Sequence, residues 1–468
     1  MSRLLQSEHL WIVSPLLTTL GFLLALVLLA HLLRQQRSPS STIAWLLMIL
    51  LLPYLGVPLY LMFGGRKIRR MAEKKEPVYG PPWSIPTGAI GGSIERILQS
   101  HGVPPASAGN RVMVEPNGEE TYRQLVRILD GAERSIHITT YILGRDAVGE
   151  AIVERLARRA AEGLEVRLLL DDVGSWRVGR RFLAPLVEAG AKVAFFMPMI
   201  HLPFRGRANL RNHRKIVVVD RRWAMLGGMN LASKYMGPTP DPTRWRDLSL
   251  FLAGPVVPEL AELFRSDWKF ATGEELRTDP RPPLPPEPLG DSYAQVVASG
   301  PDVAGDPLYE ALVSAIFTAT RRIWVVTPYF VPDETLARAL DLAARRGVEV
   351  RLVVPAHSNH RMADLARGSY LRLVHNAGGR VLLFEPGMVH AKVVLIDDRL
   401  AIIGSANMDM RSLFLNYEVA LFLYSRPPIE ATAVWVESLM AECTTGLPVP
   451  SRASELAENV VRLLSPLL

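Results

Sequence analysis

The sequence is poor in the residues that form disulfide frameworks. Its 468 residues contain one cysteine, Cys443, so a disulfide within the chain is excluded. A chain with so little cysteine suits a reducing compartment. The histidines described below are not accompanied by a cluster of metal-ligating residues, so neither a metal nor another cofactor is expected.

Charge is absent from two long stretches near the N-terminus. Residues 10–33 and 42–65 contain no Asp, Glu, Lys or Arg, and each stretch is 24 residues long. A helix of that length crosses a hydrocarbon core of about 30 Å. Buried core helices are the alternative, but they would have to be apolar on every face. A cleaved signal peptide fits less well, because the first apolar run is too long and a second one follows closely.

Basic residues flank these stretches. Arg3 precedes the first, Arg34 and Arg37 lie in the connection, and the run at 66–75 (RKIRRMAEKK) holds six basic residues and one acid. Basic flanks favour the cytoplasm. We therefore expect a transmembrane hairpin within residues 1–70, in the inner cell membrane, with both termini and the catalytic region in the cytoplasm. Because this run carries +5 of the formal net charge of +7, a basic groove for nucleic acid is not expected.

One pattern, H-x-K-x4-D-x6-G-[GS]-x-N, occurs twice in register and organises the rest of the chain. Its members are His213, Lys215, Asp220, Gly227, Gly228 and Asn230 in the first copy, and His390, Lys392, Asp397, Gly404, Ser405 and Asn407 in the second. Two copies of so long a pattern in one chain point to a shared function rather than to chance.

Local physics gives each copy the same expected structure. The runs KIVVVD and KVVLID are typical of buried strands, so the His and Lys of each copy should point to the same side. Asp220 and Asp397 belong to the candidate catalytic set by position, but each is expected to open a turn to a second strand and to act there as an orienting residue. The Gly-Gly and Gly-Ser pairs allow the backbone to approach a ligand and carry an Asn to it.

Two sets of His, Lys and Asn without a metal suit a phosphodiester. One neutral His attacks phosphorus while a second, protonated His gives a proton to the leaving alkoxide. Two Lys and two Asn can hold the non-bridging oxygens as charge develops.

The paired pattern resembles that of the phospholipase D superfamily. Within it, the run-outs at 245–255 (WRDLSLFLAGP) and 407–425 (NMDMRSLFLNYEVALFLYS), with the two apolar segments, resemble bacterial cardiolipin synthases. The resemblance implies that two halves form one site, that a phosphohistidine forms without a metal, and that a carboxylate following each motif, Asp247 or Glu418, hydrogen-bonds its His. It further implies that phosphatidylglycerol is both donor and acceptor, with cardiolipin and glycerol as products.

The chain reads as a duplication of alternating strands and helices. RSIHITTYIL and EVRLLLDD in the first half match RRIWVVTPYFV and EVRLVVPA in the second, which predicts two pseudo-symmetric α/β sandwiches with the active site between them. Five parts are expected: the hairpin at 1–70, a linker at 71–109, the first half at 110–278, a stiff Pro-rich linker at 279–291 and the second half at 292–468.

Other polar residues have two interpretations each. Arg411 and Ser412 could contact phosphate or cap a turn. Arg205, Arg207 and Arg211 could meet anionic lipid headgroups or lie in a solvated loop. Four histidines outside the motifs have no spacing that repeats between the halves and are expected to be structural or loop residues: His201, His357, His360 and His375.

The expected mechanism has His213 as the nucleophile and His390 as the acid that protonates the leaving alcohol and then deprotonates the acceptor. Lys215, Lys392, Asn230 and Asn407 would stabilise the charge. Alternatives are a lipid hydrolase with water as acceptor, a transferase with another acceptor, a nucleic-acid phosphodiesterase, and an inactive membrane scaffold, against which the complete set of motif residues argues. The sequence leaves the oligomeric state open.

Overall fold

The computed structural model describes residues 26–27, 39–52, 54, 56–57, 60, 75–82, 91–197, 210–276, 288–447, 450–451, 455–456, 458 and 461. The chain divides into two compact units. The smaller comprises Met1–Arg69 and Phe204–Asn209, and the larger comprises Arg70–Pro203 and Leu210–Leu468.

The described part of the smaller unit contains helix α2 (Pro39–Leu51), which buries Ile49 against Trp45 and Tyr60. The rings of Trp45 and Tyr60 meet edge to face at 5.4 Å. Among the described residues, no helix is both long enough and apolar enough to span a bilayer. The predicted span at 10–33 and much of the one at 42–65 lie outside the described residues.

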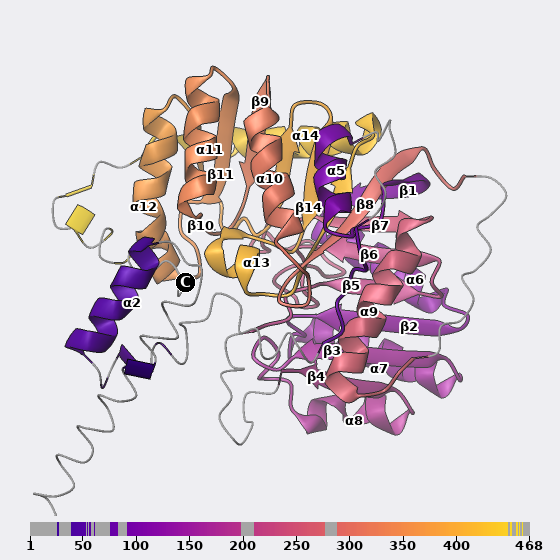
Figure 1. Cartoon of the computed structure of the whole chain (residues 1–468). Helices are drawn as coiled ribbons and strands as arrows, with labels where there is room; N and C mark the ends of the chain where they lie inside the picture. The colour runs from indigo at the N-terminus through magenta and orange to yellow at the C-terminus, as the bar shows by residue number, and fades with distance from the viewer. Residues whose placement is uncertain are drawn as a thin grey trace, which may run out of the picture. The chain divides into compact units, whose positions relative to one another are not determined.

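The larger unit, in its described residues, is built on one mixed sheet of 15 strands (Figure 1). The strands of the first half are β1 (Ser107–Glu115), β2 (Ser135–Thr140), β3 (Glu165–Asp171), β4 (Lys192–Phe196), β5 (Ile216–Val219), β6 (Trp223–Gly227) and β7 (Ser249–Ala253). The strands of the second half are β8 (Ser292–Ser299), β9 (Arg322–Val326), β11 (Glu349–Pro355), β12 (Arg380–Phe384), β13 (Val393–Ile396), β14 (Leu400–Gly404), β16 (Glu418–Leu423) and β17 (Cys443–Thr445).

The strand order repeats from the centre of the sheet outward. The first half runs β1-β7-β6-β5-β2-β3-β4, and the second runs β8-β16-β14-β13-β9-β11-β12 before it adds β17. The halves join through the antiparallel pair β1–β8, with Ser107 opposite Ala294 and Asn110 opposite Ser292. This repeated order confirms the predicted α/β fold of two equivalent halves.

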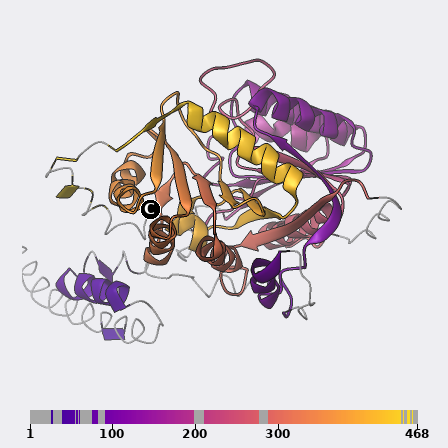
Figure 2. The ribbon, with the colours of Figure 1, turned by 90° about the horizontal axis from the view of Figure 1, so that it is seen from above.

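Each half places helices on both faces of its strands. The helices of the larger unit are α5 (Gly92–Ser100), α6 (Gly118–Asp130), α7 (Ala147–Ala161), α8 (Arg180–Glu188), α9 (Val256–Thr272), α10 (Pro307–Thr318), α11 (Glu334–Arg345), α12 (Arg361–Asn376), α13 (Met410–Phe414) and α14 (Arg426–Ala441). Figure 2 shows α14 on one side of the second-half strands and α10–α12 on the other. A small parallel sheet of β10 (Phe330–Val331) and β15 (Met408–Asp409) lies beside α13.

Local signals explain where several of these helices begin. The side chains of Asn117, Asp146 and Asp333 accept hydrogen bonds from the first free backbone N–H groups of α6, α7 and α11. These groups have no partner within the helix, so an Asn or Asp at this position stabilises the helix start by about 1 kcal/mol.

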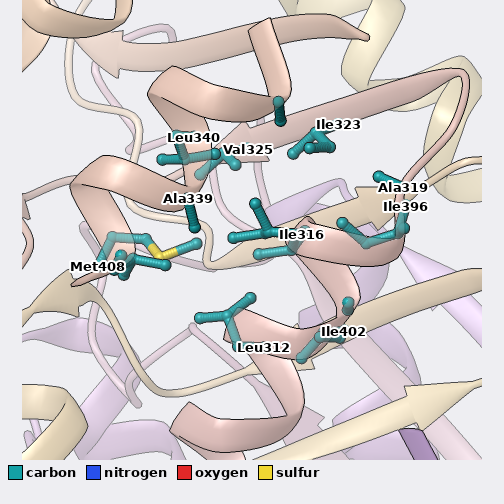
Figure 3. Close-up of a cluster of buried hydrophobic side chains, with 14 of the residues drawn as sticks. Leu312, Ile316, Ala319, Ile323, Val325, Ala339, Leu340, Ile396, Ile402 and Met408 are labelled. Atoms are coloured by element: carbon teal, nitrogen blue, oxygen red, sulfur yellow. The ribbon is translucent and has the colours of Figure 1, made fainter. Parts of the chain in front are cut away.

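Apolar side chains from helices and strands form the core of each half. One cluster fills the space between α10, α11 and the second-half strands (Figure 3). Its members include Leu312, Ile316, Ile323, Val325, Leu340, Ile396 and Ile402, all at most 6% exposed. Burying one such side chain contributes about 1.5–3 kcal/mol, so the core fixes the strands that carry the second motif.

Candidate active site

The two histidines lie just ahead of strands rather than within them. β5 begins at Ile216 and β13 at Val393, so the His and Lys of each motif form short extended segments before these strands. The sequence pattern predicts these residues within the strands, but each Lys lies one residue and each His three residues before the first residue of its strand. The physical reason is that the backbone here bonds to the other half: His213 N–H donates to Tyr417 O at 2.9 Å, and His390 N–H donates to Arg246 O at 2.7 Å.

The carboxylates that orient the histidines are exchanged between the halves. His213 Nδ1 lies 3.0 Å from Glu418 Oε1, and His390 Nδ1 lies 2.7 Å from Asp247 Oδ2. The expectation that each carboxylate bonds the His of its own motif is therefore wrong. Tyr417 and Arg246, the residues just before the carboxylates, pair with the segment of the opposite half and carry Glu418 and Asp247 across with them.

This arrangement fixes the chemical state of both rings. A carboxylate accepts the proton on Nδ1, so Nε2 of each ring carries the lone pair that attacks phosphorus or exchanges a proton. Each half therefore supplies one ring and the group that orients the other ring, and neither half alone would be complete.

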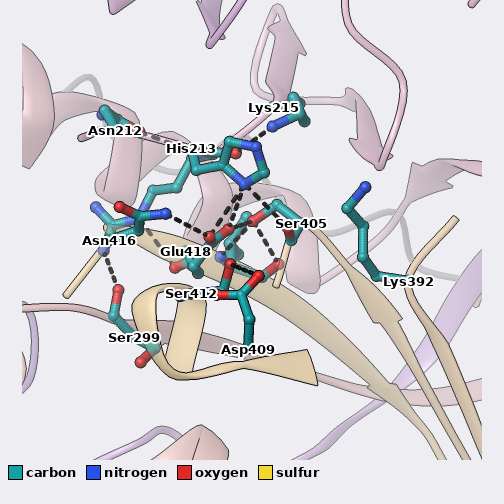
Figure 4. A network of polar contacts seen from close by, with 12 residues as sticks. Asn212, His213, Lys215, Ser299, Lys392, Ser405, Asp409, Ser412, Asn416 and Glu418 are labelled. Carbon is teal, nitrogen blue, oxygen red and sulfur yellow. Dashed lines mark hydrogen bonds and ion pairs between the residues drawn. The ribbon is translucent and has the colours of Figure 1, made fainter. Parts of the chain in front are cut away.

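The residues after the two Gly positions support the carboxylates in different ways. A Cβ at Gly228 would lie 2.1 Å from Asp247 Oδ1, so only glycine leaves room for that carboxylate. The matched residue of the second half is Ser405, whose hydroxyl donates to Glu418 Oε2 and whose carbonyl accepts from His213 Nδ1 at 3.1 Å. Figure 4 shows Ser405 and Glu418 together beneath the His213 ring.

The two lysines stand beside the histidines in a buried setting. Lys215 Nζ donates to His213 O at 2.6 Å, and Lys392 Nζ lies 3.1 Å from His390 Nε2. Burial lowers the pKa of Lys215 to about 7 and that of Lys392 to about 8, although nearby carboxylates oppose the shift. Both ammonium groups would be held fully charged by a bound anion.

The histidines are also held neutral by their surroundings. Burial, followed by the positive charge of Lys392, lowers the pKa of His390 to about 3 despite Asp247. Burial lowers the pKa of His213 as well, against the opposing effect of Glu418. A phosphodiester carries a negative charge, so its arrival favours protonation of one ring while the other stays a nucleophile.

The two asparagines complete the set around the cavity. Asn230 Oδ1 accepts from Ile142 N–H at 3.1 Å, and Asn230 Nδ2 is buried with no hydrogen bond to any described residue. Asn407 lines the same cavity and leaves its Oδ1 unbonded among the described residues. A buried amide N–H without a partner costs about 1–3 kcal/mol, which a ligand oxygen that accepts from Asn230 Nδ2 would recover.

Asp220 and Asp397 lie at the other end of β5 and β13, in the turns to β6 and β14. The carboxylate of Asp220 accepts from the backbone of Glu133, Arg134 and Ser135 at 2.8 Å. Asp397 binds backbone N–H groups of 320–322 in the same way. Both adopt a positive φ, 54° and 51°. This geometry agrees with the turn interpretation and places neither residue in the cavity.

A cavity of about 320 Å³ joins the two motifs. Its lining includes His213, His390, Asn230 and Asn407 from the motifs, and also Tyr141, Arg211, Tyr235, Trp245, Tyr329, His360, Asp409, Arg411, Ser412 and Asn416. Among the described residues, no three His, Cys, Asp or Glu side chains converge as metal ligands.

Several lining residues were not anticipated or had been interpreted differently. Tyr235 packs on His390 and Tyr141 on His213 at ring distances of 5.1 and 4.9 Å, and no spacing in the sequence pointed to either. His360, expected to be structural or in a loop, lies on the cavity wall at the start of α12. Arg211 is 3% exposed, so it is neither solvated nor at a surface, and its guanidinium donates to Met197 O.

The other residues with two interpretations lie either at the cavity or in the segment 198–209, which is outside the described residues. Arg411 lines the cavity, whereas Asp409, not Ser412, caps α13 by accepting from Ser412 N–H at 2.7 Å. Arg205 and Arg207 lie outside the described residues.

A known protein family matches the sequence of this chain in both halves. The family described as "Cardiolipin synthase, PLD-like domain" matches residues 125–268 and 312–440, one match in each half. The family described as "Phospholipase_D-nuclease N-terminal" matches residues 23–65. The crystal structure of the phosphatidylserine synthase of Haemophilus influenzae superposes on 80% of this chain and 100% of its own, with a TM-score of 0.59 and 15% identity, which establishes a common fold.

Fold and site thus define a two-half protein of the phospholipase D type. The chain is 35% identical to the cardiolipin synthase of Geobacillus thermodenitrificans over 93% of its own length and 90% of that protein. It is 33% identical to cardiolipin synthase A of Pseudomonas entomophila over 95% and 96% of the two chains. The chain belongs to the cardiolipin synthases of the phospholipase D superfamily, a family of phosphatidyltransferases, and the resemblance seen in the paired motifs is confirmed.

Proposed function

We propose that the protein joins two phosphatidylglycerol molecules into cardiolipin and releases glycerol, through a phosphatidyl-histidine intermediate. The observation that carries the proposal is the crossed pair, His213 with Glu418 and His390 with Asp247, around one cavity that also holds both motif asparagines. Two oriented histidines facing one anion site suit a two-step displacement at phosphorus.

In the first step, Nε2 of His213 attacks the phosphorus of the donor. A P–N bond forms, the P–O bond to the glycerol headgroup breaks, and protonated His390 gives its proton to the departing oxygen. Burial and, after it, the positive charge of Lys392 beside the ring make protonated His390 a strong acid, because both favour proton loss.

In the second step, neutral His390 takes the proton from a hydroxyl of the second phosphatidylglycerol. That oxygen attacks phosphorus, the P–N bond breaks, and both histidines return to their starting states. Lys215, Lys392, Asn230 and Asn407 would hold the non-bridging oxygens in both steps, where fixed donors are worth about 3–4 kcal/mol each.

A bilayer location would bring the substrates together. The segments at 10–33 and 42–65 would form a hairpin in the inner membrane and hold the catalytic halves, with bounds near 110–278 and 292–468, at its cytoplasmic surface. Both substrates are confined to the bilayer, so attachment raises their effective concentration at the site. A hydrolase, or a transferase with another acceptor, would use the same first step and differ only in the second.

The test is reconstitution of the full chain in phosphatidylglycerol vesicles, with lipid products separated by mass. We expect cardiolipin and glycerol from the wild type, a loss of at least 10³-fold in His213→Ala and His390→Ala, and no loss in His375→Ala, an exposed histidine of α12. A donor with a p-nitrophenol leaving group needs no acid, so His390→Ala should still accumulate a phosphatidyl-enzyme with it, and His213→Ala should not. Phosphatidic acid as the sole product would instead identify a hydrolase.

A further inference from the structure

A buried cluster of charges lies directly behind His213. It consists of Lys75, Arg214, Asp267 and Asp302, each at most 4% exposed, together with the side chain of Asn212. Lys75 Nζ contacts Asp267 Oδ1 and lies 2.6 Å from Asp302 Oδ2. Arg214 Nη1 lies 2.6 Å from Asp267 Oδ1, and Arg214 Nη2 lies 3.4 Å from Asp302 Oδ2. Two cations and two anions make the cluster neutral overall.

The cluster includes the side chains of the residues on either side of His213 and is hydrogen-bonded to the backbone of Glu418. Arg214, the residue after His213, donates from Nε to the backbone O of Glu418 at 3.1 Å. Asn212, the residue before His213, donates from Nδ2 to Asp267 Oδ2 at 3.0 Å, and its Oδ1 accepts from Arg214 N–H at 3.1 Å. The backbone on either side of His213 is therefore fixed by groups that the cluster holds.

Lys75 has an unexpected place in this arrangement. It ends the basic run at 66–75, which the sequence pattern predicts to be a cytoplasmic flank of the second apolar segment. Its ammonium group instead lies 4.9 Å from the centre of the Tyr417 ring. The segment after Lys75 also contacts the cluster, because Val78 N–H donates to the backbone O of Asp302 at 3.1 Å. Tyr79 accepts from Ala298 N–H at 2.6 Å.

In the described residues of the second half, no charged cluster corresponds to this one. The residues that match Asn212 and Arg214 are Val389 and Ala391, both apolar and fully buried behind His390. Within the described part of the chain, an ionic cluster that is costly to bury thus lies behind His213 but not behind His390. We propose that Lys75 is a positioning residue: through Asp267, Asp302 and Arg214 it sets the position and the charge environment of His213, and it joins the segment after the apolar region to the nucleophile.

This inference rests on the proposed role of His213. The charged groups that act most strongly on His213 are Glu418, Lys215 and Lys392, and Arg211 and Arg411 line the same cavity. All five stay in place in the variants at Lys75 and Asp302. Loss of Lys75 leaves one uncompensated negative charge behind the ring, which favours the protonated imidazole. Loss of Asp302 leaves one uncompensated positive charge, which favours the neutral imidazole.

The experiment measures the pH dependence of kcat/KM for cardiolipin formation by the full chain in mixed micelles of phosphatidylglycerol. The acid limb reports protonation of the nucleophile in the free enzyme. We expect Lys75→Met to lower kcat about 10–100-fold with KM nearly unchanged and to move the acid limb up by roughly 0.5–1 pH unit. Asp302→Asn should move it down, and Lys75→Met/Asp302→Asn, again neutral, should return it close to the wild-type position.

The matched control is Lys269→Met, which removes a lysine that pairs with Glu76 at the surface of the same region and should leave the limb in place. A purely structural role for Lys75 would lower the unfolding temperature and the active fraction without shifting the limb in opposite directions, and that result would overturn the inference. If Lys75→Met does not fold, Asp302→Asn and Lys75→Arg, which keeps the charge, decide the matter by the same readout. An inactive wild type, or an active His213→Ala, would count against the proposed function instead.

Discussion

His213 and His390 occupy equivalent places ahead of β5 and β13, but their surroundings differ. Behind His213 lie Arg214 and the charges around it, and Arg211 shares its side of the cavity. His390 instead packs against the rings of both Tyr235 and Trp245, at 5.1 and 5.4 Å. The duplicated motif therefore supplies equivalent reacting groups, while the neighbours that differ place a charged cluster behind one ring and a second aromatic side chain beside the other. Equal chemistry in unequal settings is what a nucleophile and an acid require.

The largest effect is expected when either of the two carboxylates that orient the histidines is replaced by its amide. Glu418→Gln and Asp247→Asn should each lower kcat by about 10³–10⁴-fold, because the amide no longer holds the reactive tautomer of the ring that it contacts. With the p-nitrophenol donor, Asp247→Asn should recover formation of the phosphatidyl-enzyme and Glu418→Gln should not. Burst kinetics measure this difference.

The control for that comparison is Glu442→Gln, which removes a surface carboxylate paired with Arg246 and should change little. If Asp247→Asn blocked the intermediate and Glu418→Gln spared it, the roles of the two histidines would have to be exchanged.

A smaller effect should come from exchanging the residues that support the carboxylates. Gly228→Ser forces a Cβ against Asp247, so we expect a loss of activity of about 100-fold or more and of about 1–3 kcal/mol in the free energy of unfolding. Ser405→Gly removes one hydroxyl donor to Glu418 and should cost about tenfold in kcat. Urea unfolding and steady-state kinetics test both. Equal tolerance of the two exchanges would show that the halves support their carboxylates in the same way.

The smallest effect concerns stability and pH. The folded-state pKa of His390, about 3, lies below its unfolded value near 6.5, so the unfolded chain binds more protons between these values. The free energy of unfolding is therefore highest, as far as His390 is concerned, above about pH 6.5. It decreases as the pH falls towards 3, by at most about 1.4 kcal/mol per pH unit for this one proton. His390→Gln should make the free energy of unfolding in urea less dependent on pH between pH 7 and 5, and the remaining dependence includes the contributions of His213 and Lys215. An unchanged slope would mean that His390 is already protonated in the empty site.

Much of the fold could be read from local patterns. The runs EVRLLLDD and EVRLVVPA became β3 and β11, and α7 (Ala147–Ala161) precedes β3, in agreement with the expected alternation of strands and helices. These segments carry strong periodicity and clear caps, so local physics decides them. RRIWVVTPYFV divides instead into β9 and β10, because the chain leaves the sheet at the cavity edge and pairs with β15.

The site could be predicted in its members but not in its partnerships. The paired spacing identified His213 and His390, and the family resemblance added Asp247 and Glu418, yet it assigned each carboxylate to the wrong ring. No motif or spacing in the sequence predicted Tyr141, which follows β2 directly and lines the cavity.

The sequence by itself determined the duplicated strand–turn–strand units, the residue types that react and the family to which the chain belongs, because periodicity, turn chemistry and motif spacing act over short distances along the chain. Only the tertiary structure decided which carboxylate holds which ring and that Lys75 is buried behind His213. Those choices depend on how two halves pair across one sheet, where burial makes an unpaired charge costly and selects partners that lie up to 227 residues apart.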